Sequence, residues 1–522
     1  MRLLGIFMLN AWENSKFHIL LHLINFIKSL TMKTMKKYLI LLFTAFMTSV
    51  SAKEYNASFF GIKSNGTTMN TRSIQKAIDY IHENGGGTLA FYVGRYLTGT
   101  VFLKSNVTIH LYEGAVIVGS TNPYDYDECL NNPSLILAYQ SENIAITGQG
   151  VIDGQGRSVA YNWIDQIHKG ILVDEMKYDR PGKRPFLLYF RECNHVTVDG
   201  IITKNSTAWV QYYDQCNYLT INNVTVRSNA FWNNDGIDIV DCSNVTLTNS
   251  FIDASDDAIC LKSHDAGKIC ENIVIRNCVA RSGASGVKFG TMSRGGFRNV
   301  KLSNIKVYNT FRSAFTVQAV DGGIAENISI DSLFSYNTGN VIFLRVGDRW
   351  SEGRRSSMKG ITITNVYAEV PEGKPDAGYD YEGPTEDNPR NISPCAIMGL
   401  PGQDVANVTI KNVTIVFPGG GNPHYAKVGL TPKELDAIPE MPAAYPEFSQ
   451  FKELPAWGFY LRHAQGITFE NITLTAQKTD YRPAIVIDDV KDMTLTGMKY
   501  MEPGKSKNQV FTYKSKNIQI NK

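Results

Sequence analysis

The sequence predicts an all-β protein that folds as a right-handed parallel β-helix with an N-terminal capping helix. A short phrase recurs along the chain, in which Asn, Gly or Asp precedes branched apolar residues, often with Thr between them. Between Asn217 and Asn327, successive copies start 27, 28, 27 and 28 residues apart. The copies begin at Asn106, Asn143, Asn217, Asn244, Asn272, Asn299, Asn327, Gly360, Asn407, Gly466 and Asn517.

This period decides the fold class. Repeats of about 28 residues, filled with β-branched strands and Asn or Gly turns, leave no room for a helix in each unit. Each repeat must therefore be a coil of strands that buries its apolar side by stacking on its neighbours. Parallel crossovers are overwhelmingly right-handed, so the coil is expected to be right-handed as well.

The first 52 residues are predicted to be an upstream extension followed by a signal peptide. A basic stretch at 35–37 precedes an apolar run over 38–47, and the small residues at 50–52 suit signal peptidase. We expect the true start at Met32 or Met35. A membrane-anchored extension is the alternative. Cleavage after Ala52 would leave residues 53–522 as a single exported β-helix domain.

The mature chain is expected to open with the capping helix. Asn70 and Thr71 can cap a helix over 72–83 that places apolar residues on one face and covers the open end of the stack. These apolar residues are Ile74, Ala77, Ile78 and Ile81. The repeat is interrupted at 144–193, 366–406 and 414–465, where we expect binding loops laid over the rigid scaffold.

The composition excludes several classes of protein. Of 522 residues, 19% are charged and the net charge is +3, which is too balanced for a nucleic-acid binder or a disordered tail. Eight cysteines are too few for a disulfide scaffold of this length. None of them forms a C-x-x-C pair, which disfavours a zinc knuckle.

Three aspartates are brought together when the coils are aligned. Asp235 and Asp257 then fall in one column on adjacent coils, roughly 4.8 Å apart, with Asp256 beside them. The alignment rests on small residues at equivalent places in four strands, namely Gly236, Ala258, Gly286 and Ala314.

Stacked carboxylates have a definite chemistry. Burial and mutual repulsion raise at least one pKa, which leaves an acid beside bases. Glycosidic hydrolysis needs that division, with one group to protonate the leaving oxygen and another to activate water or act as nucleophile. The same residues could instead fill turns of the β-helix or hold calcium.

The aspartates also carry a resemblance to glycoside hydrolase family 28, the polygalacturonase-type pectin hydrolases. That family shows N-T-D, then G-D-D or S-D-D, then G-H-G and R-I-K on successive coils. Residues 233–235 read Asn-Asn-Asp and residues 255–257 read Ser-Asp-Asp. Residues 454–458 and 482–484 resemble the tail of bacterial exported members. The resemblance extends over nearly the whole mature chain and implies a pectin-lyase-like solenoid.

The resemblance implies an inverting mechanism. Asp256 would be the general acid, and Asp235 with Asp257 would position and activate the water. The sequence departs from the family at two motifs. Ala284-Ser285-Gly286 replaces G-H-G, and Thr316-Val317-Gln318 replaces R-I-K, so the usual histidine and both usual cations are missing.

Other side chains are expected to hold the sugar. Lys288 and Arg345 lie on the same outward face, one coil to either side of Gln318, and Lys262 occupies the same column as Arg345. The full set of predicted substrate-binding residues is Asn233, Lys262, Ser285, Lys288, Gln318, Arg345 and Trp209. Because the cations are altered, we expect little activity on plain homogalacturonan and more on a branched or mixed pectic glycan such as rhamnogalacturonan.

The sequence thus predicts an exported glycoside hydrolase that cleaves pectin-like polysaccharide. It is expected to act in the periplasm or outside the cell, as a monomer, with a polysaccharide or oligosaccharide substrate. No cofactor, metal, nucleic acid or stable membrane insertion is expected. Two alternatives remain open: a calcium-dependent polysaccharide lyase of the same fold, and a non-catalytic carbohydrate-binding β-helix.

Overall fold

The structure is a computed structural model, and it describes residues 53–127, 130, 132–177, 180–373, 375, 393–421, 429–504 and 507–521. The predicted upstream extension and signal peptide, residues 1–52, lie outside the described residues. From Glu54 onward the chain forms one compact unit. Among the described residues, no helix has both the length and the apolar character needed to span a membrane.

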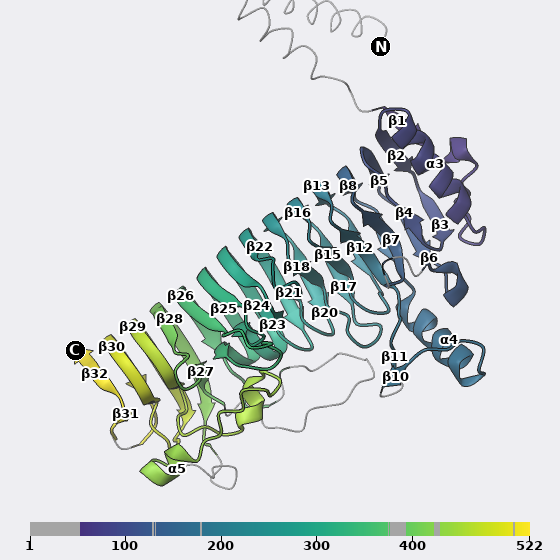
Figure 1. The fold of residues 1–522 in the computed structure, drawn as a ribbon. Coiled ribbons are helices and arrows are strands. Elements are labelled where there is room, and N and C mark those ends of the chain that lie inside the picture. The colour runs from purple at the N-terminus through teal and green to yellow at the C-terminus, as the bar shows by residue number, and fades with distance from the viewer. Residues whose placement is uncertain are drawn as a thin grey trace, which may run out of the picture. The chain divides into compact units, whose positions relative to one another are not determined.

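Within the described residues, thirty strands form one continuous sheet that winds into stacked coils (Figure 1). Strands inside the stack pair in parallel with the strand one coil earlier and the strand one coil later, as β18 does with β15 and β21. This confirms the predicted all-β parallel β-helix. The coil has three faces, which we call face I, face II and face III.

Faces I and II carry the repeated phrase and the strand after it. Face I contains β1 (Glu54–Asn56), β2 (Gly87–Phe91), β5 (Val107–Leu111), β8 (Glu142–Gly148), β13 (Asn194–Asp199), β16 (Asn217–Asn222), β19 (Ser243–Thr248) and β32 (Lys516–Asn521). Face II contains β3 (Gly94–Thr98), β6 (Ala115–Gly119), β9 (Val151–Asp153), β14 (Ile202–Lys204), β17 (Thr225–Ser228) and β20 (Phe251–Ala254).

Face III carries the aspartates. It contains β4 (Val101–Phe102), β7 (Ser134–Tyr139), β12 (Phe186–Arg191), β15 (Gln211–Asp214), β18 (Ile237–Val240), β21 (Ile259–Ser263), β23 (Val287–Ser293), β27 (Cys395–Met398) and β31 (Val510–Tyr513). Longer strands bend through two or three faces, namely β22 (Cys270–Ser282), β24 (Gly296–Ala319), β25 (Ile324–Val346), β26 (Ser357–Glu369), β28 (Val405–Gly419), β29 (Phe459–Lys478) and β30 (Ile485–Met501).

The recurring asparagine has a physical reason. Asn244, Asn272, Asn299 and Asn327 all adopt positive φ near +55°, a left-handed conformation that Asn tolerates better than most residues. Each side-chain amide donates to the Oδ1 atom of the asparagine one coil earlier, as Asn299 does to Asn272 at 3.3 Å. The phrase therefore repeats because every coil needs the same turn and the same side-chain hydrogen bond to the asparagine of the coil before it.

A helix precedes the first complete coil, where one was predicted. Helix α3 (Thr71–Glu83) buries its four predicted apolar residues in the same core as the strands, and it lies beside β1 and β2 in Figure 1. Asn70 is the N-cap residue, as expected, but its side chain makes no hydrogen bond to the helix. It accepts one from the Lys63 amide at 2.8 Å.

Two inserts stand next to face III. The first, between β9 and β12, holds α4 (Gly156–His168) and a hairpin of β10 (Met176–Lys177) and β11 (Arg180–Pro181). The second, residues 429–453, holds α5 (Pro432–Asp436) and the 3₁₀ turn η4 (Phe448–Phe451). Shorter 3₁₀ turns are η1 (Ala57–Phe60) and η2 (Pro123–Asp125).

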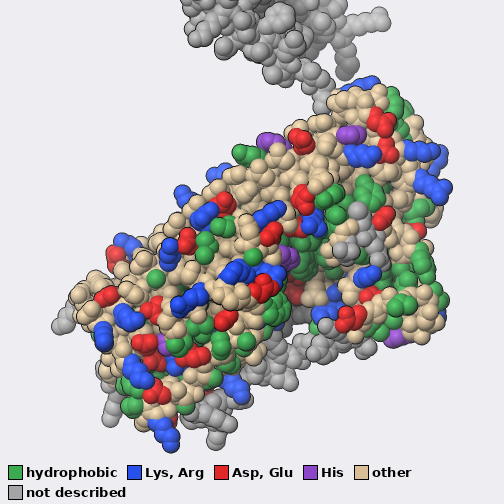
Figure 2. All heavy atoms as spheres, in the orientation of Figure 1, with side chains coloured by type: hydrophobic (Ala, Val, Ile, Leu, Met, Phe, Trp, Pro, Cys, Tyr) green, Lys and Arg blue, Asp and Glu red, His purple; other side chains and the backbone are tan. Residues whose placement is uncertain are grey.

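The second insert is packed firmly onto the coil. Leu435, Ile438 and Phe448 of the insert form one buried apolar cluster with Phe343 and Tyr460 of face III. Figure 2 shows the surface hollowed between the side that carries α4 and the side that carries α5. The two inserts thus flank the stretch of face III where the predicted site residues lie.

Candidate active site

The register of face III agrees with the sequence alignment. Ile237 pairs with Ile259, Ile259 with Val287, and Val287 with Phe315. The Gly236 amide donates to the Asp257 carbonyl at 2.9 Å, which places Asp235 and Asp257 at equivalent positions on adjacent coils. The aspartates precede their strands, so their side chains leave the coil at its outer surface while the strand residues behind them fill the core.

The three predicted carboxyl groups converge. One oxygen of each of Asp235, Asp256 and Asp257 lies within 4.8 Å of one oxygen of the other two. Asp235 and Asp257 are buried, and Asp256 is partly exposed. Three carboxyl groups this close cannot all remain ionised without cations beside them.

Two lysines supply those cations. The Lys288 ammonium contacts Asp257 Oδ2 at 2.7 Å and Tyr445 Oη at 3.1 Å. The Lys262 ammonium contacts Asp235 Oδ2 at 2.9 Å and also Asp238. Both lysines are buried, with exposed fractions of 3% and 6%. Both were predicted to bind substrate, and in this structure their ammonium groups neutralise the aspartates.

The surroundings separate the pKa values of Asp256 and Asp257. Burial raises the pKa of Asp257, but Lys288, followed by Lys262 and Arg312, outweighs it and holds the pKa below its ordinary value. Burial and the neighbouring Asp257 charge raise the pKa of Asp256 above its ordinary value. The geometry therefore provides one carboxyl that keeps its proton to a higher pH beside another that ionises readily.

Asp235 shares its cation with Asp238. Burial raises the pKa of Asp235 well above its ordinary value, against the opposing charge of Lys262. Burial likewise raises the pKa of Asp238 to about 6. One ammonium thus serves two buried carboxyl groups, so the cluster holds an additional proton at mildly acid pH.

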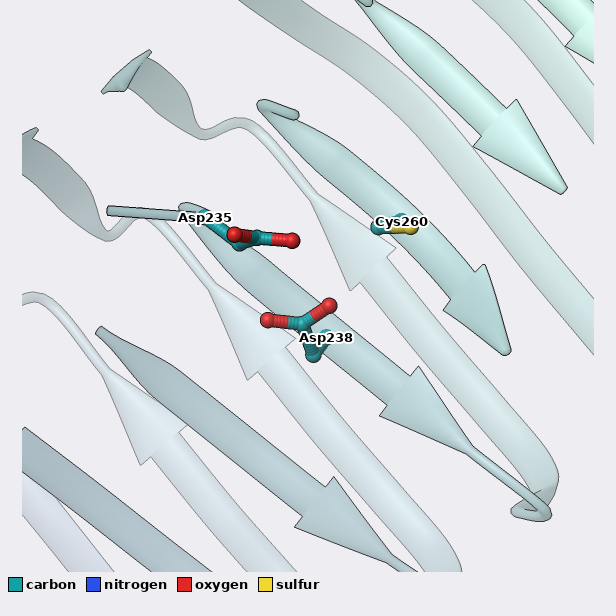
Figure 3. Close-up of side chains that lie close together, drawn as sticks. All are labelled: Asp235, Asp238 and Cys260. Carbon is teal, nitrogen blue, oxygen red and sulfur yellow. The ribbon is translucent and has the colours of Figure 1, made fainter. Parts of the chain in front are cut away.

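Figure 3 shows Asp235 and Asp238 pointing toward one another, with Cys260 on the neighbouring strand. Their ligand atoms lie close enough to hold a metal ion. The residues fit an ammonium group better than a metal. Lys262 contacts both carboxylates, and burial raises the pKa of the Cys260 thiol well above its ordinary value, which disfavours the thiolate a metal requires.

Asn233 connects Asp256 to two arginines. Its Nδ2 atom donates to Asp256 Oδ2 at 3.3 Å, and its Oδ1 atom accepts from Arg180 and Arg184, each at 2.9 Å. Because both arginines can only donate, they fix which end of the amide faces Asp256. The predicted residue Asn233 is thereby placed at the carboxylates with a defined orientation.

The remaining predicted residues fall into two groups. Ser285 contacts Asp257 through its backbone amide, which donates to Oδ1 at 3.1 Å, and Trp209 lies 4.3 Å from the Lys262 ammonium. Gln318 donates to the Pro446 carbonyl at 2.9 Å, and Arg345 donates to the carbonyls of Gly399, Glu440 and Met441. Gln318 and Arg345 are therefore engaged in holding the second insert.

Sequence reasoning missed several residues around the carboxylates. Arg312 lies in the column of Asp256, two coils later, and forms an ion pair with Glu447 at 3.2 Å. Extending the alignment two residues before Ala314 would have found it. Tyr445 and Glu447 belong to the second insert and Arg180 and Arg184 to the first, where no repeat gives the register.

The sequence of the coils that carry the aspartates matches a known family. The sequence profile described as glycosyl hydrolases family 28 matches residues 94–319, a range that contains all three converging aspartates. The central coils of the chain are therefore similar to glycoside hydrolase family 28. This similarity agrees with the resemblance of the Asn-Asn-Asp and Ser-Asp-Asp phrases.

Two relatives with polygalacturonase-type names match parts of the chain. A "Probable polygalacturonase" of Vitis vinifera is 26% identical over 290 residues, which cover 50% of this chain and 57% of the relative. An "Exo-poly-alpha-D-galacturonosidase" of Dickeya chrysanthemi is 31% identical over 178 residues, which cover 31% of this chain and 27% of the relative. The chain therefore matches less than two thirds of either relative's length.

The fold is shared with a solved member of family 28. The structure of a family 28 exopolygalacturonase from Yersinia enterocolitica matches with a TM-score of 0.56 at 19% identity. The match covers 90% of this chain and 79% of that one.

Proposed function

We propose that this chain is an exported family 28 glycoside hydrolase that cleaves glycosidic bonds in pectic polysaccharide or oligosaccharide. The observation that carries the proposal is the convergence of Asp235, Asp256 and Asp257 with opposite pKa shifts at Asp256 and Asp257. The names of the relatives, which refer to polygalacturonate, support the pectic substrate class.

The roles follow from the protonation states. Asp256 keeps its proton to a higher pH than an ordinary aspartate, so it is suited to protonate the leaving glycosidic oxygen. Asp257 is held ionised by Lys288 and is suited to take a proton from the attacking water. The family resemblance assigns Asp235, at the equivalent position one coil earlier, to positioning that water.

The separation of the carboxyl groups bears on whether the enzyme inverts or retains the configuration of the sugar. Inverting glycosidases generally keep their two carboxyl groups roughly 6.5–9.5 Å apart, and retaining enzymes roughly 5–5.5 Å. Here the nearest carboxyl oxygens lie within 4.8 Å, closer than the general rule gives for inversion. We retain inversion as the proposal because the family resemblance implies it. Proton NMR of the first-formed anomer, recorded before mutarotation, decides between the two.

The second insert adds a substrate-facing wall. Tyr445 is exposed, with Lys288 and Arg312 lying 5.5 and 5.8 Å from its ring centre. Lys288 and Arg312 restore positive charge near the positions where Thr316 and Gln318 replace the usual cations. We therefore propose that a uronate carboxylate is bound here, with the tyrosine ring against the sugar.

The decisive experiment is turnover on a panel of pectic oligosaccharides and polysaccharides, including unbranched polygalacturonate and rhamnogalacturonan, with product mapping. Asp256→Asn should lower turnover about 10²- to 10⁴-fold while the far-ultraviolet circular dichroism stays unchanged, because a general acid typically contributes that much. Products that absorb in the ultraviolet would indicate a lyase. Glycan binding with no turnover by the wild type would indicate a non-catalytic β-helix.

A further inference from the structure

One segment of the second insert, residues 438–447, runs along face III toward the carboxylates, and we call it the strap. Near its end, Tyr445 contacts the Lys288 ammonium at 3.1 Å, and Glu447 forms its ion pair with Arg312 at 3.2 Å. The position of the strap therefore decides where the tyrosine wall of the proposed site stands.

Side chains from several coils hold the strap by its backbone carbonyls. Arg462 of β29 donates to the Ile438 carbonyl at 2.8 Å, Arg345 of β25 donates to the carbonyls of Glu440 and Met441, and Gln318 of β24 donates to the Pro446 carbonyl at 2.9 Å. Guanidinium and amide groups keep the same charge between about pH 5 and pH 9. These contacts therefore hold the strap to the same extent across that range.

The ring of His463 adds a contact of a different kind, because it is buried between two carboxylates from different elements. Its Nε2 atom lies 3.0 Å from Glu440 Oε1 of the strap, and its Nδ1 atom lies 2.7 Å from Asp489 Oδ2 of β30. Arg462 contacts the same Glu440 oxygen at 2.8 Å, and its Nε atom lies 3.5 Å from Asp488. The ring thus joins the strap to the coil.

This link needs a proton on both ring nitrogens. An ionised carboxylate can only accept hydrogen bonds, and a neutral imidazole has a single N–H to donate. Only the imidazolium can donate to Glu440 and Asp489 at once. Burial lowers the pKa of His463, but the two carboxylates outweigh both burial and the Arg462 charge and raise it, which agrees with the geometry.

We propose that His463 is a positioning residue whose protonated ring latches the strap to β30 and so keeps Tyr445 and Glu447 at the carboxylates. When the ring loses its proton, one of its two contacts sets a nitrogen lone pair against a carboxylate, and the strap is held less tightly. The latch is complete below the unfolded pKa and is lost as the pH rises through the folded pKa.

The latch is a property of the strap and does not depend on hydrolysis. Its effect on sugar binding rests on the proposed function, because that function places the sugar against the Tyr445 ring. The test therefore has one readout for the strap and another for turnover.

Hydrogen exchange of peptides that cover residues 438–447 measures how tightly the strap is held. Rates are recorded at about pH 5.5 and pH 8.5 and corrected for the intrinsic exchange rate at each pH. In the wild type, protection should fall about five- to tenfold at the higher pH, because one charge-assisted hydrogen bond is lost. His463→Gln should show the lower protection at both pH values.

Asp489→Asn separates the charge of the ring from its contacts. The asparagine amide can donate to an unprotonated Nδ1 atom while Nε2–H donates to Glu440, so a neutral ring completes the link. Protection in this variant should be the same at both pH values. His195→Gln is the matched control, because this exposed histidine is stacked on Tyr218 of face I, and it should keep the wild-type pH dependence.

The KM and kcat of pectic oligosaccharides, measured at the same pH values, give the second readout. The wild-type KM should rise at the higher pH relative to that of Asp489→Asn, while the ratio of the two kcat values stays constant. Equal protection of the wild-type strap at both pH values, or a wild-type pH dependence in Asp489→Asn, would overturn the inference. A pH-dependent strap without turnover of any pectic substrate would refute the proposed function and leave the latch standing.

Discussion

Replacing Lys288 with methionine tests whether this lysine sets the charge of the proposed base. Its ammonium lies 2.7 Å from Asp257 Oδ2, and each of the two side chains is 3% exposed, so solvent screens the pair little. Methionine keeps the volume of the lysine stem in the buried column and removes the charge. Removing one partner of a buried ion pair typically costs about 3–5 kcal/mol, because the other charge remains buried and unpaired.

The loss of unfolding free energy in Lys288→Met should depend on pH in a way that identifies its cause. In the wild type the pKa of Asp257 is lowered, so its contribution to stability is present above the unfolded pKa and is lost as the pH falls through the folded pKa. In Lys288→Met, burial dominates and raises that pKa. The variant should therefore lose about 3 kcal/mol of unfolding free energy at pH 7, and the deficit should shrink on acidification as Asp257 takes up a proton.

Urea denaturation between pH 4 and 7 measures the deficit, and the acid limb of the kcat/KM profile follows the ionisation of the base. That limb should move to higher pH in the variant. Lys301→Met, on an exposed position of β24, controls for the loss of a lysine and should leave both readouts unchanged. An unchanged acid limb in Lys288→Met would refute the claim that this lysine keeps Asp257 ionised.

Two further predictions concern metal and the second insert. Activity should survive EDTA, because Lys262 and Lys288 already neutralise the carboxylates; an absolute calcium requirement would favour the lyase. Burial lowers the pKa of His463, but Glu440 and Asp489 outweigh both burial and the Arg462 charge and raise it. The His463 contribution to stability is therefore present below about pH 6.5 and is lost as the pH rises through the folded pKa. His463→Gln should lower the unfolding free energy by about 1 kcal/mol at pH 5.5 and by less at pH 8.5, and a pH-independent deficit would contradict this.

The register of face III could be predicted because one physical constraint repeats in every coil. A strand that buries alternate residues needs a small residue where it enters the coil, and Gly236 and Ala258 meet that need 22 residues apart. Once those two are aligned, Asp235 and Asp257 must be neighbours. The carboxylates were therefore found from local pattern alone, and Arg312 could have been found in the same way.

The inserts could not be predicted in this way, because their positions depend on packing rather than on period. Tyr445 reaches Lys288 only because Leu435, Ile438 and Phe448 bury the insert against Phe343. Gln318 was predicted to hold substrate from its place in the column. In the structure its amide donates to the Pro446 carbonyl, which the sequence gives no reason to place nearby.

The same distinction explains why the sequence did not predict the burial of the cations around the site. An outward lysine on a β-helix strand is expected to reach solvent, and Lys262 would do so on a bare coil. Here the Trp209 ring centre lies 4.3 Å from the Lys262 ammonium, and Asp238, one coil back, provides a second carboxylate, so Lys262 is buried with a 6% exposed fraction. The charge of Lys262, which its position in the column predicted to bind substrate, thus holds the buried carboxylates of Asp235 and Asp238 together. The positive charge proposed to face a sugar comes instead from Lys288 and Arg312, which lie 5.5 and 5.8 Å from the ring centre of Tyr445.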